Sequence, residues 1–341
     1  MSRQSKLVAA LGVATSLVVF GPLPAAAQPA PDLSGKTVHL IIGFGVGGGY
    51  DLWGRTVGRY IGKHLPGNPN VVPQNMPGAG SVVAANYLYN IAPKDGSTFG
   101  IIARDAPLVP LTGGQGVRFD ATKLTWLGTP ADETNVCIAW HTAKVKKIDD
   151  LFHTQLIVGD TGIGTGTHSY PKALNGLLGM KFKLVSGFTS SSNVFLAMER
   201  GEVEGICESI DSVEHRKPDW IPKKTISVLF QAGAKPNPDL AGVPFILDYA
   251  KTEEQKQALR FLYAGQGIGR PFAAPPDLSP AVLKMLRDAF SATMKDPAFV
   301  AEVKKLKLHF APEDGAQLES LIKQIYATPK AVRDKVGALI K

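Results

Sequence analysis

Two glycine-rich turns occupy corresponding places in the two halves of this 341-residue chain. The first covers residues 43–49 and follows the apolar run 38–42. The second covers residues 162–166 and follows the apolar run 156–158. A helical pattern follows each turn, so several unpaired backbone N–H groups and the positive end of a helix dipole should gather there. Two such turns facing each other would hold a small anion from both sides, which is typical of a receptor.

The alternation of strands and helices continues along most of the chain. We expect strands at residues 38–42, 71–72, 99–103, 136–140, 156–158, 183–185, 203–207 and 225–230, and helices at 52–64, 82–90, 148–152, 170–178, 194–200, 280–294, 297–305, 315–326 and 329–340. This order predicts mostly parallel sheets with helices on both faces. The last part has too few strands for a domain of its own and should return to cover the first half. A ligand would then lie between two lobes, at the carboxyl ends of the strands.

The first 27 residues have the pattern of a cleavable export signal. Arg3 and Lys6 form a charged start, residues 7–20 are apolar, and Ala25 to Ala27 offer a cleavage site. No stretch reaches the roughly 18 apolar residues of a membrane span. We therefore expect residues 1–27 to be a signal peptide, residues 33–130 with 262–341 to form lobe 1, and residues 131–261 to form lobe 2.

Charge and cysteine content narrow the function further. The formal net charge is +8, but Lys and Arg are spread along the chain without an arginine-rich run or basic-aromatic interleaving, so nucleic acid is not an expected partner. The two cysteines, Cys137 and Cys207, lie in apolar strand-like runs without metal-binding spacing. An oxidising compartment would allow them to pair, but the favoured interpretation is two buried small hydrophobic residues.

Enzymatic alternatives find weak support in the motifs. Residues 43–48 fit G-x-G-x-x-G, yet no acidic residue occurs between Asp51 and Asp95 to hold a ribose. Signatures of phosphate loops, nucleophile elbows and zinc proteases are missing. Isolated candidates, namely His168 with Ser169 and the acids Glu208, Asp211 and Glu214, are interpreted as capping or surface groups. We expect no catalytic residue, cofactor or metal; an NAD-type dehydrogenase and an exported hydrolase are the alternatives.

Six segments in order resemble one known family, the Bug receptors, which are the periplasmic solute receptors of tripartite tricarboxylate transporters. Residues 38–51 resemble the family's strand, turn and G-G-x-x-D, residues 75–80 its N-R-P-G-A-G, and residues 92–98 its A-x-P-D-G-Y-T. Residues 162–168 resemble G-x-G-[ST]-x-x-H, residues 201–204 G-x-V-[DQE], and residues 272–275 its F-A-P segment. Met76 replaces the usual arginine and Ala197 a common aspartate, so the resemblance does not identify the solute.

The resemblance implies a type II periplasmic binding protein: two doubly wound α/β lobes joined by a two-crossover hinge, closing like a Venus flytrap. It implies a periplasmic monomer that hands a small carboxylate, such as a di- or tricarboxylate or an aromatic acid, to integral membrane permease subunits. By position, the ligand-binding residues would be Phe44, Gly45, Val46, Gly47, Gly48, Gly49, Tyr50, Asp51, Asn75, Gly78, Ala79, Gly80, Ser81, Gly164, Thr165, Gly166, Thr167, His168, Ser190 and Ser191.

Side chains near the turns would provide selectivity, because backbone donors ignore the rest of the ligand. Phe44, Tyr50, Trp53 and Phe188 are the candidates, although Phe44 and Trp53 fit core packing better. Asp51 is interpreted as a group that satisfies free N–H groups at a helix start rather than as a ligand contact. For His168, a ligand contact and a bond to backbone are equally compatible with the sequence.

Overall fold

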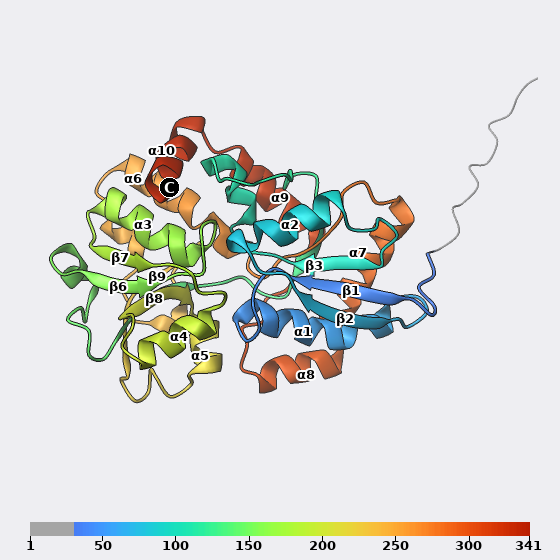
Figure 1. Ribbon diagram of the computed structural model, residues 1–341, viewed down its shortest axis with the longest axis horizontal. Helices are drawn as coiled ribbons and strands as arrows, with labels where there is room; N and C mark the ends of the chain where they lie inside the picture. The colour runs from blue at the N-terminus through green and yellow to red at the C-terminus, as the bar shows by residue number, and fades with distance from the viewer. Residues whose placement is uncertain (1–30) are drawn as a thin grey trace, which may run out of the picture.

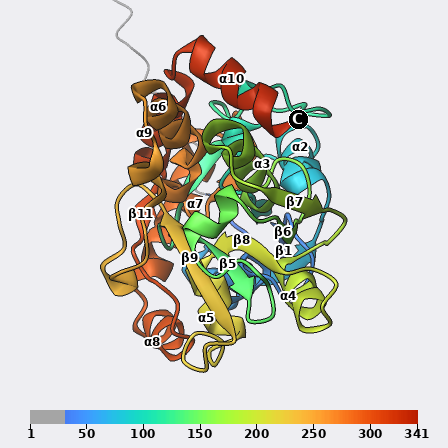
Figure 2. The same cartoon turned by 90° about the vertical axis from the view of Figure 1, so that its left-hand side faces the viewer.

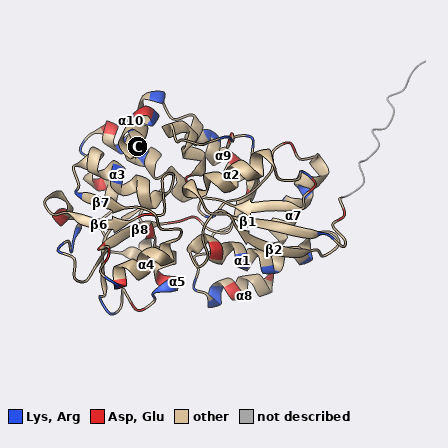
Figure 3. Ribbon diagram, in the orientation of Figure 1, with Lys and Arg blue, Asp and Glu red and all other residues tan. Residues whose placement is uncertain are grey.

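The computed structural model describes residues 31–341, so the expected signal peptide at residues 1–27 lies outside the described residues. The described chain forms two α/β lobes that lie side by side (Figure 1). Basic and acidic residues are interspersed over both lobes (Figure 3), as the spread of charge along the sequence indicates. No helix of residues 31–341 is long and apolar enough to cross a membrane.

Lobe 1 contains a six-stranded sheet in which the three strands that come first in the chain run parallel to one another. Its order is β11 (Glu313–Asp314), β4 (Thr125–Thr129), β10 (Phe272–Ala274), β3 (Thr98–Ile101), β1 (Thr37–Ile42) and β2 (Asn70–Asn75). β10 is antiparallel to both β3 and β4. One face is covered by α1 (Gly49–Ile61), α7 (Pro280–Lys295) and α8 (Pro297–Lys305), and the other by α2 (Val82–Asn90) and α9 (Gly315–Tyr326).

Lobe 2 repeats this strand order with five strands. The order is β7 (Phe182–Val185), β6 (Leu156–Gly159), β8 (Gly205–Ser209), β5 (Asn135–Trp140) and β9 (Ile226–Ala232), with β5 antiparallel to both neighbours. α4 (Ser191–Glu199) and α5 (Ile210–Arg216) pack on one face, and α3 (Gly166–Leu178) on the other. The order β2-β1-β3-β10-β4 in lobe 1 thus corresponds to β7-β6-β8-β5-β9 in lobe 2, with the antiparallel strand β10 or β5 in fourth place. This shared topology confirms the predicted fold class.

Local sequence signals explain why these elements begin where they do. β1 is buried along most of its length, as a parallel strand covered on both faces should be. Asp296 accepts hydrogen bonds from the backbone N–H groups of Ala298 and Phe299, and Pro297 opens α8. Asp314 and Gln317 form a capping box at the start of α9. α8 and α9 have the boundaries that the sequence predicts.

Two crossovers connect the lobes and lie against each other. Residues 130–134 lead from β4 to β5, and residues 264–271 return to β10. The N–H of Glu133 donates to the carbonyl of Gln266 at 3.0 Å, and the N–H of Arg270 donates to Thr129 Oγ1 at 2.9 Å. The last helix, α10 (Lys330–Ile340), packs against α3 and α6 (Glu253–Leu262) as well as against residues 110–112 (Figure 2). It therefore spans both lobes, whereas the sequence prediction placed it in lobe 1; the exact lobe boundaries stay a prediction.

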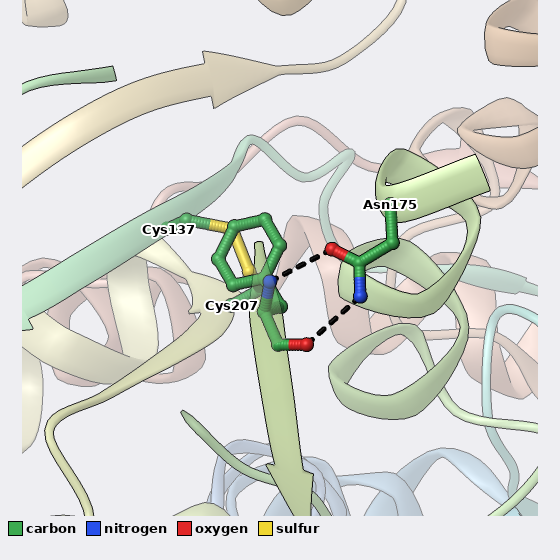
Figure 4. Close-up of a disulfide and its surroundings, with 4 residues drawn as sticks. Cys137, Asn175 and Cys207 are labelled. Atoms are coloured by element: carbon green, nitrogen blue, oxygen red, sulfur yellow. Dashed lines mark hydrogen bonds between the residues drawn. A yellow bond between two sulfur atoms is a disulfide. The ribbon is translucent and has the colours of Figure 1, made fainter. Parts of the chain in front are cut away.

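The cysteine interpretation favoured by the sequence is wrong. Cys137 in β5 and Cys207 in β8 form a disulfide (Figure 4). They are direct partners in the antiparallel register, with Cα atoms 4.0 Å apart, and both are fully buried. The strand-like runs were correctly recognised, but a run of apolar residues does not reveal which strand lies opposite. The disulfide closes a separation of 70 residues and joins two central strands of lobe 2.

Candidate functional site between the lobes

Three helices point their N-termini at one cavity between the lobes. Its volume is about 30 Å³, which is room for about two water molecules. The start of α1 contributes Gly48, Gly49 and Tyr50, the start of α3 contributes residues 165–167, and the start of α4 contributes Ser190 and Ser191. Each helix start leaves backbone N–H groups without intrahelical partners, and the three dipoles add positive potential. The arrangement is suited to an anion.

Asp51 shapes the first turn from behind. Its Oδ2 accepts the N–H of Gly47 at 2.9 Å, and its Oδ1 accepts from Arg55 Nε at 2.9 Å and from Asn75 Nδ2 at 2.8 Å. Asn75 also donates to the carbonyl of Phe44 at 2.8 Å. Asp51 is buried and does not line the cavity. It satisfies a backbone N–H at the helix start, as the favoured interpretation held.

Threonine hydroxyls hold the second turn in shape. Thr165 Oγ1 and Thr167 Oγ1 are 2.8 Å apart, and Thr167 Oγ1 accepts the N–H of Thr161 at 2.9 Å. His168 Nδ1 lies 3.1 Å from Asp160 Oδ2, which also accepts from Ser186 Oγ. His168 is therefore engaged by a buried carboxylate of its own lobe, and it does not line the cavity.

Direct contacts between the lobes close the cavity. The N–H of Gly45 donates to the carbonyl of Thr189 at 3.1 Å, and Ser192 Oγ donates to the carbonyl of Gly47 at 2.6 Å. On the other side Tyr170 Oη donates to Asp105 Oδ1 at 2.9 Å. At this volume the cavity holds about two water molecules and is too small for a di- or tricarboxylate.

About half of the residues expected to bind ligand line the cavity. Those that do are Phe44, Gly48, Gly49, Tyr50, Thr165, Gly166, Thr167, Ser190 and Ser191. The others do not line it: Gly45, Val46, Gly47, Asp51, Asn75, Gly78, Ala79, Gly80, Ser81, Gly164 and His168. A Cβ on Gly80 would stand 2.5 Å from the carbonyl oxygen of Ile163, so the turn at residues 78–81 contacts the second glycine turn. Their contact with ligand stays a prediction.

The sequence reasoning missed the charged residues of the cavity. Arg104, Asp105, Glu208 and Arg270 line it together with Ala103 and Thr161. Glu133 from the first crossover binds both guanidinium groups: its Oε2 lies 3.3 Å from Arg104 Nη1, and its Oε1 accepts from Arg270 Nε. Arg104 and Asp105 follow β3, so the rule that ligands meet the carboxyl ends of strands could have found them. Glu208, dismissed as a surface or capping acid, is buried.

Aromatic side chains form one wall. The rings of Phe44 and Tyr50 stack with centroids 4.3 Å apart, and the guanidinium of Arg270 lies 4.5 Å from the centre of the Tyr50 ring. Tyr50 Oη accepts the N–H of Arg104 at 2.9 Å. Trp53 belongs to the core of lobe 1, as the favoured interpretation held, and the partly buried Phe188 packs against the core of lobe 2. Neither lines the cavity.

Asp211 in the first turn of α5 gives a testable pH dependence. Burial, and then the neighbouring Glu133, raise the pKa of Asp211 to about 7, while Arg270 and His309 act in the opposite direction and Glu214 adds to the rise. Because the pKa is higher in the folded than in the unfolded state, its stabilising contribution is full below about pH 4 and is lost as pH rises towards 7.

We therefore expect Asp211→Asn to flatten the dependence of unfolding free energy on pH between 4 and 7. Urea unfolding at several pH values measures this. The hydrogen bond to Asp132 raises the pKa of His309, and Asp211 raises it further. The difference between wild type and variant therefore reports Asp211 together with the part of the His309 titration that depends on it. An unchanged slope in the variant would contradict the assignment.

Comparison with known proteins places this geometry in context. No family model matches the sequence. The chain is 24% identical to the UPF0065 protein in the gbd 5′ region of Cupriavidus necator. The alignment spans 350 residues and covers 96% of each chain. Among solved structures, the periplasmic binding protein BugD matches with a TM-score of 0.72 and 18% identity over 88% of this chain and 97% of that one.

Two further structures come from Rhodopseudomonas palustris. One was solved with adipate and matches with a TM-score of 0.70 and 18% identity over 90% of this chain and 99% of that one. The other is MatC with bound malate, with a TM-score of 0.70 and 18% identity over 88% of this chain and 98% of that one. This chain has the Bug-type fold. Within this fold, the cavity lies where the two sheets, the two crossovers and the three helix N-termini meet.

Proposed function

We propose that this protein is a periplasmic receptor that captures a small carboxylate between its lobes and delivers it to the permease of a tripartite tricarboxylate-type transporter. The observation that carries the proposal is the convergence of the N-termini of α1, α3 and α4 on one interlobe cavity. Likeness to two proteins solved with adipate and with bound malate supports the solute class. Delivery to a permease and export by residues 1–27 are parts of the same proposal.

The chemistry favours binding without turnover. A carboxylate that accepts several N–H bonds gains charge-assisted contacts worth about 1.5 to 3 kcal/mol each. Such donors hold an anion but neither attack it nor transfer a proton. Isothermal titration with mono-, di- and aromatic carboxylates tests the proposal, with micromolar or tighter binding of at least one acid expected. Binding of NAD and of no acid would favour the dehydrogenase alternative, and hydrolysis of an ester or amide substrate would favour the hydrolase.

Ser191→Pro tests the backbone donors directly. Ser191 is the first residue of α4, where proline is compatible with the helix but removes the N–H group. The preceding Ser190 is extended, with φ −157° and ψ 159°, as a residue before proline should be. We expect carboxylate affinity to fall about 10- to 100-fold, the value of one charge-assisted hydrogen bond.

The matched control is Ser191→Ala, which removes the hydroxyl and keeps the N–H. Titration of both variants separates the two groups, and circular dichroism checks that each is folded. Equal affinity of Ser191→Pro and Ser191→Ala would exclude this backbone donor from the site.

A further inference from the structure

Two carboxyl groups from opposite lobes face the same cavity without an ionic partner. Asp105 follows β3 in lobe 1, and Glu208 lies in β8 of lobe 2. Their exposed fractions are 6% and 8%. Asp105 Oδ1 accepts from Tyr170, and Glu208 Oε1 accepts the N–H of Ser209 at 2.7 Å. Within residues 31–341 neither carboxyl group has a basic side chain within 4.0 Å.

The two nearby arginines form their ion pairs with a third carboxyl group. Arg104 and Arg270 both bind Glu133, so the three carboxyl groups exceed the two guanidinium groups by one charge. Burial raises the pKa of Asp105, and Glu208 adds to that rise, whereas Arg104, the Tyr170 hydroxyl and the N–H of Gly166 lower it. Two carboxylates close together in a dry site repel each other. Lobe closure brings them together, so a positive charge between them would stabilise the closed state.

The same cavity also has groups that bind an anion. The three helix N-termini supply backbone donors, and Arg104 Nε is buried without a hydrogen-bond partner among the described residues. A ligand that carries only carboxylates would use these donors but would leave Asp105 and Glu208 uncompensated. A ligand that also carries an ammonium group would satisfy both sets.

We propose that the solute of this receptor is zwitterionic, an amino acid-like acid whose protonated amine lies between Glu208 and Asp105 while its carboxylate lies at the helix N-termini. The proposal rests on the carboxylate receptor function above and specifies its substrate class. Glu208 and Asp105 are then the residues that determine specificity, each contributed by one lobe. The ammonium would couple solute capture to closure, because the two carboxylates meet only when the lobes are together.

The test compares amino acids with the same acids lacking the amine: glycine with acetate, 4-aminobutanoate with butanoate, and aspartate with succinate. Titration of the wild-type protein should show at least one amino acid bound 10-fold or more tightly than its partner acid. Glu208→Gln should weaken that amino acid about 10- to 100-fold, the loss of one charge-assisted contact. Its affinity for the partner acid should change less than 3-fold or increase.

The control is Glu202→Gln, which removes an exposed negative charge of lobe 2 away from the cavity and should change neither affinity. Asp105→Asn is the second variant, to be used if circular dichroism shows that Glu208→Gln is unfolded. It should also weaken the amino acid more than its partner acid. If partner acids bind as tightly as the amino acids, this inference is overturned while the receptor function stands. If no acid of either kind binds, the receptor function itself fails.

Discussion

Replacing Glu133 by Gln should destabilise the protein by about 3 to 5 kcal/mol, the usual cost of breaking a buried ion pair by removing one partner. The Glu133 side chain is fully buried and binds Arg104 and Arg270, whose side chains are 5% and 1% exposed. Without the carboxylate, two buried positive charges would face each other at the junction of both crossovers. Urea unfolding followed by circular dichroism measures the loss.

Two controls sharpen this prediction. Glu253→Gln removes an exposed carboxylate paired with Arg260, and an exposed pair of this kind contributes about 0 to 1 kcal/mol. Replacing Glu133, Arg104 and Arg270 together by apolar residues should recover much of the stability, because neither guanidinium group is then left without its carboxylate partner. A loss below about 1 kcal/mol for Glu133→Gln would show that water reaches this cluster.

Removing the disulfide should cost about 4 kcal/mol, because the unfolded chain regains the freedom of a loop of this length. The bond joins Cys137 to Cys207 across 70 residues and links two central strands of lobe 2. The double variant Cys137→Ala, Cys207→Ala is expected to show a lower urea midpoint. Alanine keeps the buried positions apolar, so most of the change reports the lost cross-link.

A reducing agent provides the matching control. Wild-type protein unfolded in dithiothreitol should lose a similar amount of stability, whereas the double variant should be indifferent to the reagent. If wild type unfolds at the same urea concentration with and without reductant, the cysteines are not bonded in solution.

Much of the fold could be predicted because its signals are local. Apolar runs, glycine turns and capping residues located β1 and β6 within a residue and gave α2, α8 and α9 their observed ends. β10 was missed as a strand because it has only three residues and is held by strands on both sides. α5 and α6 were missed as well, and the helix expected at residues 148–152 is a 3-10 helix.

The site was predictable in its backbone but not in its charges. Glycine turns before helices can be seen in the sequence itself and predict free N–H groups. Gly48, Gly49 and Gly166 were therefore among the expected residues, and they line the cavity. Arg270, Glu133 and Glu208 come from two crossovers and a strand far apart in sequence, and only the fold brings them together. The Cys137–Cys207 pairing has the same origin, since it depends on the register of β5 with β8.

The most direct test of the central claim is a crystal structure with the acid that binds most tightly. We predict that the ligand carboxylate lies between the lobes, within hydrogen-bond distance of N–H groups at the starts of at least two of α1, α3 and α4. A carboxylate held only by surface lysines, or by one lobe away from Gly48 and Ser191, would contradict it.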